Sequence, residues 1–192
     1  MGEIALKEPE NIIEFKQILE AALLTAGQPL SLDDLLKLFA GRMERTTLRM
    51  LLDELKQDWA QENKAKTLEL VQVATGYRFQ AKPQFSEFIA RLSPEKQPKY
   101  SRVVMETLAI IAYRQPLTRG DIEQIRGVAV NPNVMRQLQE RDWIDVVGQR
   151  EVPGRPSLYA TTKHFLDDLN LRSLSELPPF EDFAQTEIPL EN

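Results

Sequence analysis

Residues 105–127 read METLAIIAYRQPLTRGDIEQIRG, and a shorter copy of this segment lies earlier in the chain. Adding 87 to each number aligns residues 28–31 (QPLS) with residues 115–118 (QPLT), and apolar positions agree on both sides of that motif. An internal repeat is the first pattern to look for because it sets the architecture of a chain. This one occurs twice, at a spacing of domain size. The sequence therefore predicts two related domains.

Each copy has the pattern of two helices joined at a corner. In the second copy, a run of apolar residues at helical spacing stops before Pro116, which cannot lie inside a helix. Thr118 can cap a new helix, Asp121 completes an acidic capping box, and Gly127 closes the helix. The first copy repeats the arrangement with Pro29, Ser31 and Asp34. Both copies therefore predict a helix-turn-helix unit.

A β-hairpin pattern follows each helix-turn-helix unit. In the first domain we expect helices at residues 11–26, 32–40, 44–61 and 84–92, with strands at 68–73 and 77–81. In the second we expect helices at 101–113, 118–126, 132–141 and 162–169, with strands at 143–147 and 157–161 around a longer wing. Three helices followed by a hairpin are typical of the winged-helix variant. The predicted fold class is mainly α with small β-hairpins, as two tandem winged-helix domains.

Composition sets the domain boundaries. Residues 93–99 (SPEKQPK) carry two prolines and no large apolar residue, which is typical of a linker. The segment at 179–192 is acidic and has little to bury, which favours disorder. We therefore predict an N-terminal domain at 1–92, a linker at 93–99, a C-terminal domain at 100–178 and a tail at 179–192.

The residue content offers little for catalysis. The 192-residue chain has no cysteine, and His164 is its single histidine, so a thiolate nucleophile and the usual histidine metal sites lack their residues. Glycines are too sparse for a phosphate-binding loop. No apolar run has the length of a membrane span, and the acidic start does not resemble a secretory signal. We expect a cytoplasmic protein without enzyme activity, cofactor or membrane contact.

The charge pattern argues against a dedicated DNA-binding protein. The net charge is −5, and residues 100–172 carry ten basic and nine acidic groups. Nucleic-acid affinity depends largely on basic contacts to phosphate. Arg150 and Arg155 in the second wing, with Arg136 and Arg141 on the preceding helix, form the best basic group, but acidic residues are interleaved among them. We expect DNA contact to be weak or indirect.

The first helix of the second domain is the most suggestive surface. Residues 108–113 (LAIIAY) are consecutive apolar residues, so the helix is apolar nearly all round, and a small domain has difficulty covering every side. One interpretation is a groove for a partner or a seam between domains; the other is full burial inside the second domain. Under the first interpretation the partner-binding candidates are Tyr113, Arg150, Arg155 and Tyr159.

Three segments together resemble a known family. Residues 106–127, 138–166 (LQERDWIDVVGQREVPGRPSLYATTKHFL) and 171–178 (LRSLSELP) are similar to the segregation and condensation protein B family, and the first domain resembles it more loosely. Residues 129–134 (AVNPNV) depart from the family pattern. The resemblance implies two winged-helix domains and a homodimer formed through the first. It also implies binding to the kleisin subunit (segregation and condensation protein A), and through it to the SMC ATPase.

For function, the resemblance implies a non-catalytic, nucleoid-associated subunit. Such a subunit acts in chromosome condensation and partition, and hence in cell division and the cell cycle. The alternative is a winged-helix DNA-binding transcriptional regulator. The implied homodimer has physical support in a surplus of apolar positions on two helices of the first domain. The dimer-interface candidates are Ile13, Leu19, Leu24, Phe85, Phe88 and Ile89.

Overall fold

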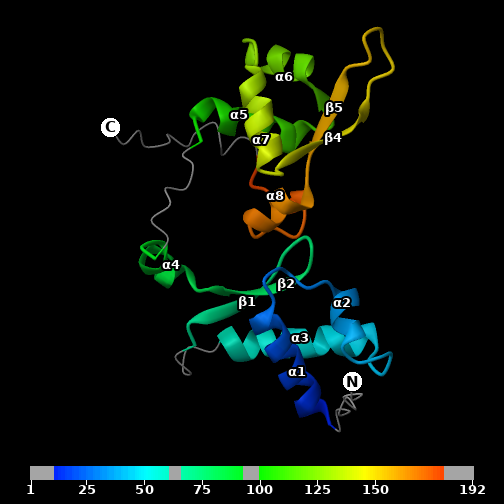
Figure 1. Ribbon diagram of the computed structural model, residues 1–192, viewed down its shortest axis with the longest axis vertical. Coiled ribbons are helices and arrows are strands. Elements are labelled where there is room, and N and C mark those ends of the chain that lie inside the picture. Colours follow the sequence, from blue (N-terminus) through cyan, green and yellow to red (C-terminus); the bar gives the residue numbers. More distant parts are fainter. Residues whose placement is uncertain (1–10, 61–65, 93–99, 180–192) are drawn as a thin grey trace, which may run out of the picture. The chain divides into compact units, whose positions relative to one another are not determined.

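The computed structural model describes residues 11–60, 66–92 and 100–179 (Figure 1). The chain divides into two compact units, Met1–Pro94 and Glu95–Asn192, here called unit 1 and unit 2. The predicted linker at 93–99 lies outside the described residues, as does all but the first residue of the predicted tail at 179–192.

Unit 1 contains four helices and one hairpin among its described residues. In chain order these are α1 (Ile12–Thr25), α2 (Leu32–Lys37), α3 (Arg45–Ala60), β1 (Leu68–Gln72), β2 (Tyr77–Ala81) and α4 (Pro83–Ala90). Strands β1 and β2 are antiparallel, with Leu70 opposite Phe79. The helices α1 and α3 pack together, and the hairpin packs on them.

A single apolar cluster holds unit 1 together. Helix α3 contributes Leu48, Leu51, Leu52 and Leu55, whose spacing places them on one face of the helix. They meet Leu19 and Leu23 of α1, Leu35 of α2 and Leu70 of β1. Phe15 packs on Phe39 with ring centroids 5.0 Å apart.

The hairpin of unit 1 is fixed to the corner between α1 and α2 by a close backbone contact. The N–H of Leu30 donates to the carbonyl of Tyr77 and the N–H of Tyr77 donates to the carbonyl of Leu30, each at 2.9 Å. Gly76 lies directly beneath this pair. A Cβ at Gly76 would stand 2.1 Å from the Leu30 carbonyl oxygen. Only glycine fits the position without moving the backbone.

In the part of unit 2 that the structure describes there are four α-helices, a 3₁₀ turn and a three-stranded sheet. In order these are α5 (Arg102–Arg114), β3 (Leu117–Thr118), α6 (Arg119–Arg126), α7 (Pro132–Glu140), β4 (Ile144–Gln149), β5 (Ser157–Thr161), α8 (Lys163–Asp168) and η2 (Leu174–Glu176). The sheet order is β3-β5-β4 and all pairings are antiparallel. A bulge interrupts β4 between Val146 and Gly148.

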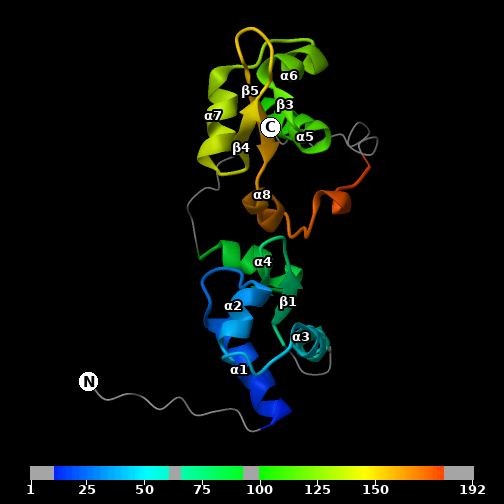
Figure 2. The same ribbon diagram turned by 90° about the vertical axis from the view of Figure 1, so that its right-hand side faces the viewer.

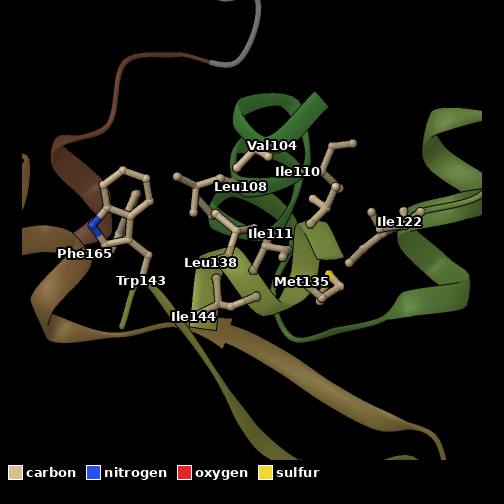
Figure 3. Packing of buried hydrophobic residues seen from close by; sticks show 13 residues of the cluster. Val104, Leu108, Ile110, Ile111, Ile122, Met135, Leu138, Trp143, Ile144 and Phe165 are labelled. Carbon is tan, nitrogen blue, oxygen red and sulfur yellow. The ribbon is translucent and has the colours of Figure 1, made fainter. Parts of the chain in front are cut away.

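Helix α5 lies at the centre of the unit 2 core (Figure 3). Its residues Val104, Leu108, Ile110 and Ile111 are buried. They pack with residues from α6, α7, β4 and α8, namely Ile122, Met135, Leu138, Ile144 and Phe165. Trp143 closes one side of this cluster, and Tyr100 packs on its ring at 4.9 Å between centroids.

The corner after α5 has the cap that the sequence predicts. The Thr118 hydroxyl accepts from the N–H of Asp121, and the Asp121 carboxylate accepts from the N–H of Thr118, so the capping box is complete. Gly127 ends α6 with φ at 71°, a left-handed conformation that favours glycine. In unit 1 the Ser31 hydroxyl caps α2 in the same way. In both units the cap hydroxyl also donates to the carboxylate, Ser31 to Asp34 at 2.6 Å and Thr118 to Asp121 at 2.8 Å.

The mixed helical chain with small antiparallel sheets agrees with the sequence prediction, and the hairpin of unit 1 is confirmed. Most element ends lie within two residues of the prediction, and two differences are larger. Helix α2 ends at Lys37 instead of Ala40, because the next three N–H groups donate to carbonyls three residues back, after which Ala40 and Gly41 have positive φ. The short strand β3 was not expected; Leu117 pairs with Tyr159 and adds a third strand to the sheet of unit 2.

Replacing Gly76 with alanine should destabilise unit 1. The added methyl would collide with the backbone of Leu30 and Ser31, so we expect Gly76→Ala to lower the free energy of unfolding by about 2 kcal/mol or more. Gly27→Ala is the matched control because its Cβ meets nothing within 4 Å. Urea denaturation followed by Trp59 fluorescence in a Trp143→Phe background measures both; equal stabilities would contradict the steric explanation.

Candidate partner-binding surfaces

Arg150 is engaged within unit 2 by Asp121. The guanidinium of Arg150 donates to both carboxylate oxygens of Asp121, at 2.9 and 2.7 Å. Such a two-bond pair fixes orientation as well as distance. Because Arg150 follows β4 and Asp121 lies in the first turn of α6, the pair ties the wing to the helix-turn-helix corner. Arg150 therefore positions the wing. Its side chain is still 42% exposed, so its role as a partner contact stays a prediction.

The same pair changes the acidity of Asp121. Hydrogen bonds from the Arg150 side chain, assisted by those from Thr118, lower the pKa of Asp121 from 3.8 to about 2. They also raise the pKa of Arg150. Asp121 is thus the one carboxylate that serves the cap of α6 and the wing together. The sequence reveals its capping role, but not its reach to a residue 29 positions away.

Arg155 lies in the turn of the wing and is exposed. Its φ is 38°, next to Gly154 with φ at 86°, and its backbone N–H donates to the carbonyl of Val152. Its side chain pairs with Glu151 at 3.4 Å. Arg155 therefore remains available to a partner as a surface charge.

The apolar run of α5 is mostly covered by unit 2 itself. Leu108, Ile110, Ile111 and Ala112 are all buried in the core. The interpretation of α5 as a broadly open apolar surface is therefore wrong, because the sheet and α7 pack around the helix. Tyr113 at its end is different. Its ring is half-buried against the core, and its hydroxyl donates to the carbonyl of Pro178.

Tyr159 occupies the middle strand of the sheet. It stands opposite Leu117 of β3 and opposite Val146 of β4, and its half-buried side chain packs against the core cluster. Tyr113 and Tyr159 therefore contact the same cluster and are both partly open to solvent. They are the two aromatic partner-binding candidates of unit 2.

Unit 1 presents several exposed apolar side chains. Ile13 is 66% exposed, and Leu24, 11 residues later and about three helical turns away, is also exposed on the same face of α1. On α4, Phe88 is 61% exposed, Ile89 is exposed and Phe85 is half-buried. Leu19 is a correction to the predicted set. It is completely buried in the core of unit 1, so it cannot lie at an interface.

A shallow groove continues the apolar surface of α1. It has a volume of about 330 Å³ and lies between α1 and α3, with Ile12 and Ile13 on its rim and Leu51 in its lining. Lys16 crosses to α3 and pairs with Asp58 at 2.8 Å and Glu54 at 3.3 Å. The lining of the groove is therefore mixed: Leu51, Leu55 and the two isoleucines are apolar, and the other six lining residues are polar or charged.

Helix α4 lacks the packing of its counterpart in unit 2. Each follows the second strand of its hairpin, and adding 80 places Phe85 on Phe165. Phe165 is only 3% exposed, whereas α4 has no buried residue at all. In Figure 1, α4 lies beyond the end of β2, away from α1 and α3. Its apolar face is therefore left open within unit 1.

The described part of the chain holds no group of three or more His, Asp or Glu side chains arranged to bind a metal ion. His164 lies exposed on α8, with its Nε2 atom 3.6 Å from the Asp168 carboxylate. Within the same described residues, no helix is long and apolar enough to cross a membrane.

Comparison with known proteins assigns the family. The family model of the segregation and condensation complex subunit ScpB matches residues 17–180. A segregation and condensation protein B homolog from Coxiella burnetii is 47% identical over 174 residues, which cover 90% of this chain and 81% of that protein. The chain belongs to the ScpB family. It is accordingly a segregation and condensation subunit.

Solved ScpB structures are also similar in sequence. The crystal structure of ScpB from Mycobacterium tuberculosis is 30% identical and covers 84% of this chain and 98% of its own, with a TM-score of 0.39. A structure described as a dimer of the ScpB N-terminal domain complexed with ScpA peptide is 25% identical and covers 43% of this chain and 92% of its own, with a TM-score of 0.36. The assignment to the ScpB family rests on the sequence matches.

Breaking the Arg150 pair should weaken unit 2 in a pH-dependent way. The lowered pKa of Asp121 means that its carboxylate stabilises the fold above about pH 4, and this contribution is lost as the pH falls toward 2. We expect Arg150→Met to lower the free energy of unfolding at pH 7, because the Asp121 carboxylate loses both hydrogen bonds from the wing. The deficit should shrink between pH 4 and pH 2.

Urea denaturation followed by Trp143 fluorescence in a Trp59→Phe background measures this effect. Arg155→Met is the matched control because it lies in the same wing and its ion pair with Glu151 is exposed. The control should change stability by no more than a few tenths of a kcal/mol. A deficit for Arg150→Met that persists unchanged at pH 2 would exclude the Asp121 carboxylate as its cause.

Proposed function

We propose that this chain acts as the dimeric accessory subunit of an SMC condensin complex, built from two winged-helix domains, and that it captures the kleisin subunit. The observation that carries the proposal is the family match over residues 17–180, which includes nearly all of the described chain. The subunit performs no chemistry of its own and acts in the cytoplasm at the nucleoid, linked to the SMC ATPase through the kleisin.

The winged-helix assignment is supported by the order of elements. Unit 1 has three helices followed by the β1–β2 hairpin, and unit 2 has α5, α6 and α7 followed by the β4–β5 hairpin. In unit 2 the short strand β3 precedes the second helix and pairs with β5, which gives a three-stranded sheet. Helix-turn-helix units with a hairpin wing have this arrangement.

The pairing of basic side chains favours protein contact over DNA contact. In unit 2 the four arginines of the suggested basic group all have partners: Arg136 with Glu140, Arg141 with Asp168, Arg150 with Asp121 and Arg155 with Glu151. Phosphate binding would require breaking these pairs, and the resulting surface would still be near neutral. This favours the kleisin-binding subunit over the transcriptional regulator, with DNA contact weak or indirect.

Tyr113 is the proposed anchor for a kleisin segment. A half-buried tyrosine offers a large rigid ring for contact and a hydroxyl for one hydrogen bond, and such anchors commonly cost about 2 kcal/mol or more when truncated. Arg155 and Tyr159 add a rim charge and a second aromatic side chain. Helix α5 beneath Tyr113 is fixed by the core, so the anchor is presented on a rigid element.

Truncating the anchor should weaken kleisin binding. We expect Tyr113→Ala to raise the Kd by more than about tenfold, while Arg136→Ala, which removes an exposed charge, changes it by less than about threefold. Titration calorimetry against the purified kleisin subunit measures both, and circular dichroism checks the fold. Tight, steeply salt-dependent duplex binding in the absence of kleisin binding would support the regulator instead.

A second copy of the chain is the proposed occupant of two apolar patches of unit 1. One patch comprises Ile13 and Leu24 on α1, and the other comprises Phe85, Phe88 and Ile89 on α4. Exposed apolar side chains gathered on two helices are typical of an interface between identical subunits. The neighbouring groove beside Ile12 and Ile13 extends the patch on α1.

A polar substitution on α4 should therefore dissociate the dimer. We expect Phe88→Ser in the full chain to shift sedimentation from dimer to monomer at micromolar concentration. Val147→Ser is the matched control because Val147 is 60% exposed, as Phe88 is, but lies on the wing of unit 2. If Phe88→Ser remains dimeric and Val147→Ser does not, the interface belongs to unit 2.

A further inference from the structure

The chain after α8 returns to the end of α5. Residues 171–178 (LRSLSELP), here called the strap, leave α8 and run back beside α5 (Figure 2). The N–H of Leu171 donates to the carbonyl of Leu166 at 2.8 Å, which fixes the start of the strap. Leu177 packs against the core cluster, and the Pro178 carbonyl accepts the hydroxyl of Tyr113. The strap therefore covers the residue proposed as the kleisin anchor.

Besides these three contacts with the rest of unit 2, the strap has internal contacts of its own. Arg172 donates its backbone N–H to Glu176 at 2.7 Å, and the two side chains form an ion pair. None of the eight strap residues is buried, whereas Phe165 on the adjacent α8 is almost fully enclosed. Segments with little buried apolar surface open at lower cost than core elements. The strap is thus a self-contained turn resting on unit 2.

The hydroxyl of Tyr113 can serve one acceptor at a time. A phenol has a single proton to donate, and in the closed arrangement that proton goes to Pro178. Leu177 and Tyr113 pack against the same core cluster, so another chain that docks at Tyr113 would meet the strap. A kleisin segment anchored at Tyr113 therefore needs the place that the strap occupies.

We propose that the strap is an intramolecular competitor of the kleisin for Tyr113 and swings away when the kleisin binds. This inference rests on the proposed function of unit 2. The strap also indicates the chemistry of the incoming segment. Leu171 and Leu177 are half-buried whereas Leu174 is exposed, so a partner segment that replaces the strap would present leucine-like residues at the positions of Leu171 and Leu177. The apparent affinity for the kleisin is then reduced in proportion to the fraction of molecules whose strap is open.

Loosening the strap should therefore tighten kleisin binding. We expect Leu177→Ala and Glu176→Ala to lower the Kd by about three- to tenfold, because both enlarge the open fraction. Glu176→Ala disturbs only the internal turn and leaves the core contacts in place, so the fold does not depend on it. Leu174→Ala is the matched control: it removes an exposed leucine of the same strap and should leave the Kd unchanged.

A spin label reports the movement directly. The chain has no cysteine, so Ser175→Cys gives a single labelling site on an exposed strap residue. Adding the purified kleisin subunit to the full chain should make the label more mobile. If the kleisin binds while the label stays immobile and both loosening variants bind no tighter than wild type, the strap is a fixed part of the domain and the proposal is overturned.

Failure of the proposed function and failure of the strap proposal give different results. Absence of kleisin binding to wild type and to both loosened variants would reject the proposed function, and the competition with it. Binding that is normal in wild type but weaker in Leu177→Ala and Glu176→Ala, with thermal stability retained, would keep the function and make the strap part of the binding surface.

Discussion

The pairing between the Gln-Pro-Leu corner and the second hairpin strand holds each unit in shape. Leu30 pairs with Tyr77 in unit 1, and Leu117, at the equivalent position of the repeat, pairs with Tyr159 in unit 2. The corner connects the first two helices, so this contact joins the helices to the wing. The two units secure it differently. Unit 1 uses a close approach over Gly76, and unit 2 adds the ion pair between Asp121 and Arg150.

This difference explains why equivalent capping residues have different partners. In unit 2 the carboxylate of Asp121 accepts from Thr118 and from the wing, so the cap of α6 and the wing depend on one side chain. In unit 1 the carboxylate of Asp34 accepts from Ser31 and from Lys37 on its own helix. The shorter hairpin of unit 1 sends no arginine to Asp34, and backbone pairing at Gly76 supplies the connection instead.

The sequence predicts local structure well because local structure depends on neighbours in the chain. The N-caps at Ser31 and Thr118, the left-handed Gly127 and the strand pair at residues 68–81 all follow from spacing and residue type. Prediction from the sequence is less reliable where a side chain's burial or partner depends on packing between distant parts of the chain. Apolar spacing alone does not reveal that Leu19 faces inward while Leu24 faces out, or that the sheet and α7 cover most of α5. Arg150 and Asp121 are 29 positions apart and meet only where the folded wing reaches the first turn of α6, so their contact could not be predicted from spacing.

The two units close their last helix in different ways, and this difference fits two kinds of partner. Helix α8 buries Phe165 and is followed by the strap, whereas α4 leaves Phe88 and Ile89 in solvent. An open apolar face of that kind promotes aggregation unless it is covered continuously, which suits a permanent contact such as a second copy of the chain. A face covered by a weakly held strap stays soluble while empty and opens when a partner arrives. We infer that α4 mediates the contact between two copies of the chain, and that the end of α5 binds the strap and the kleisin in turn.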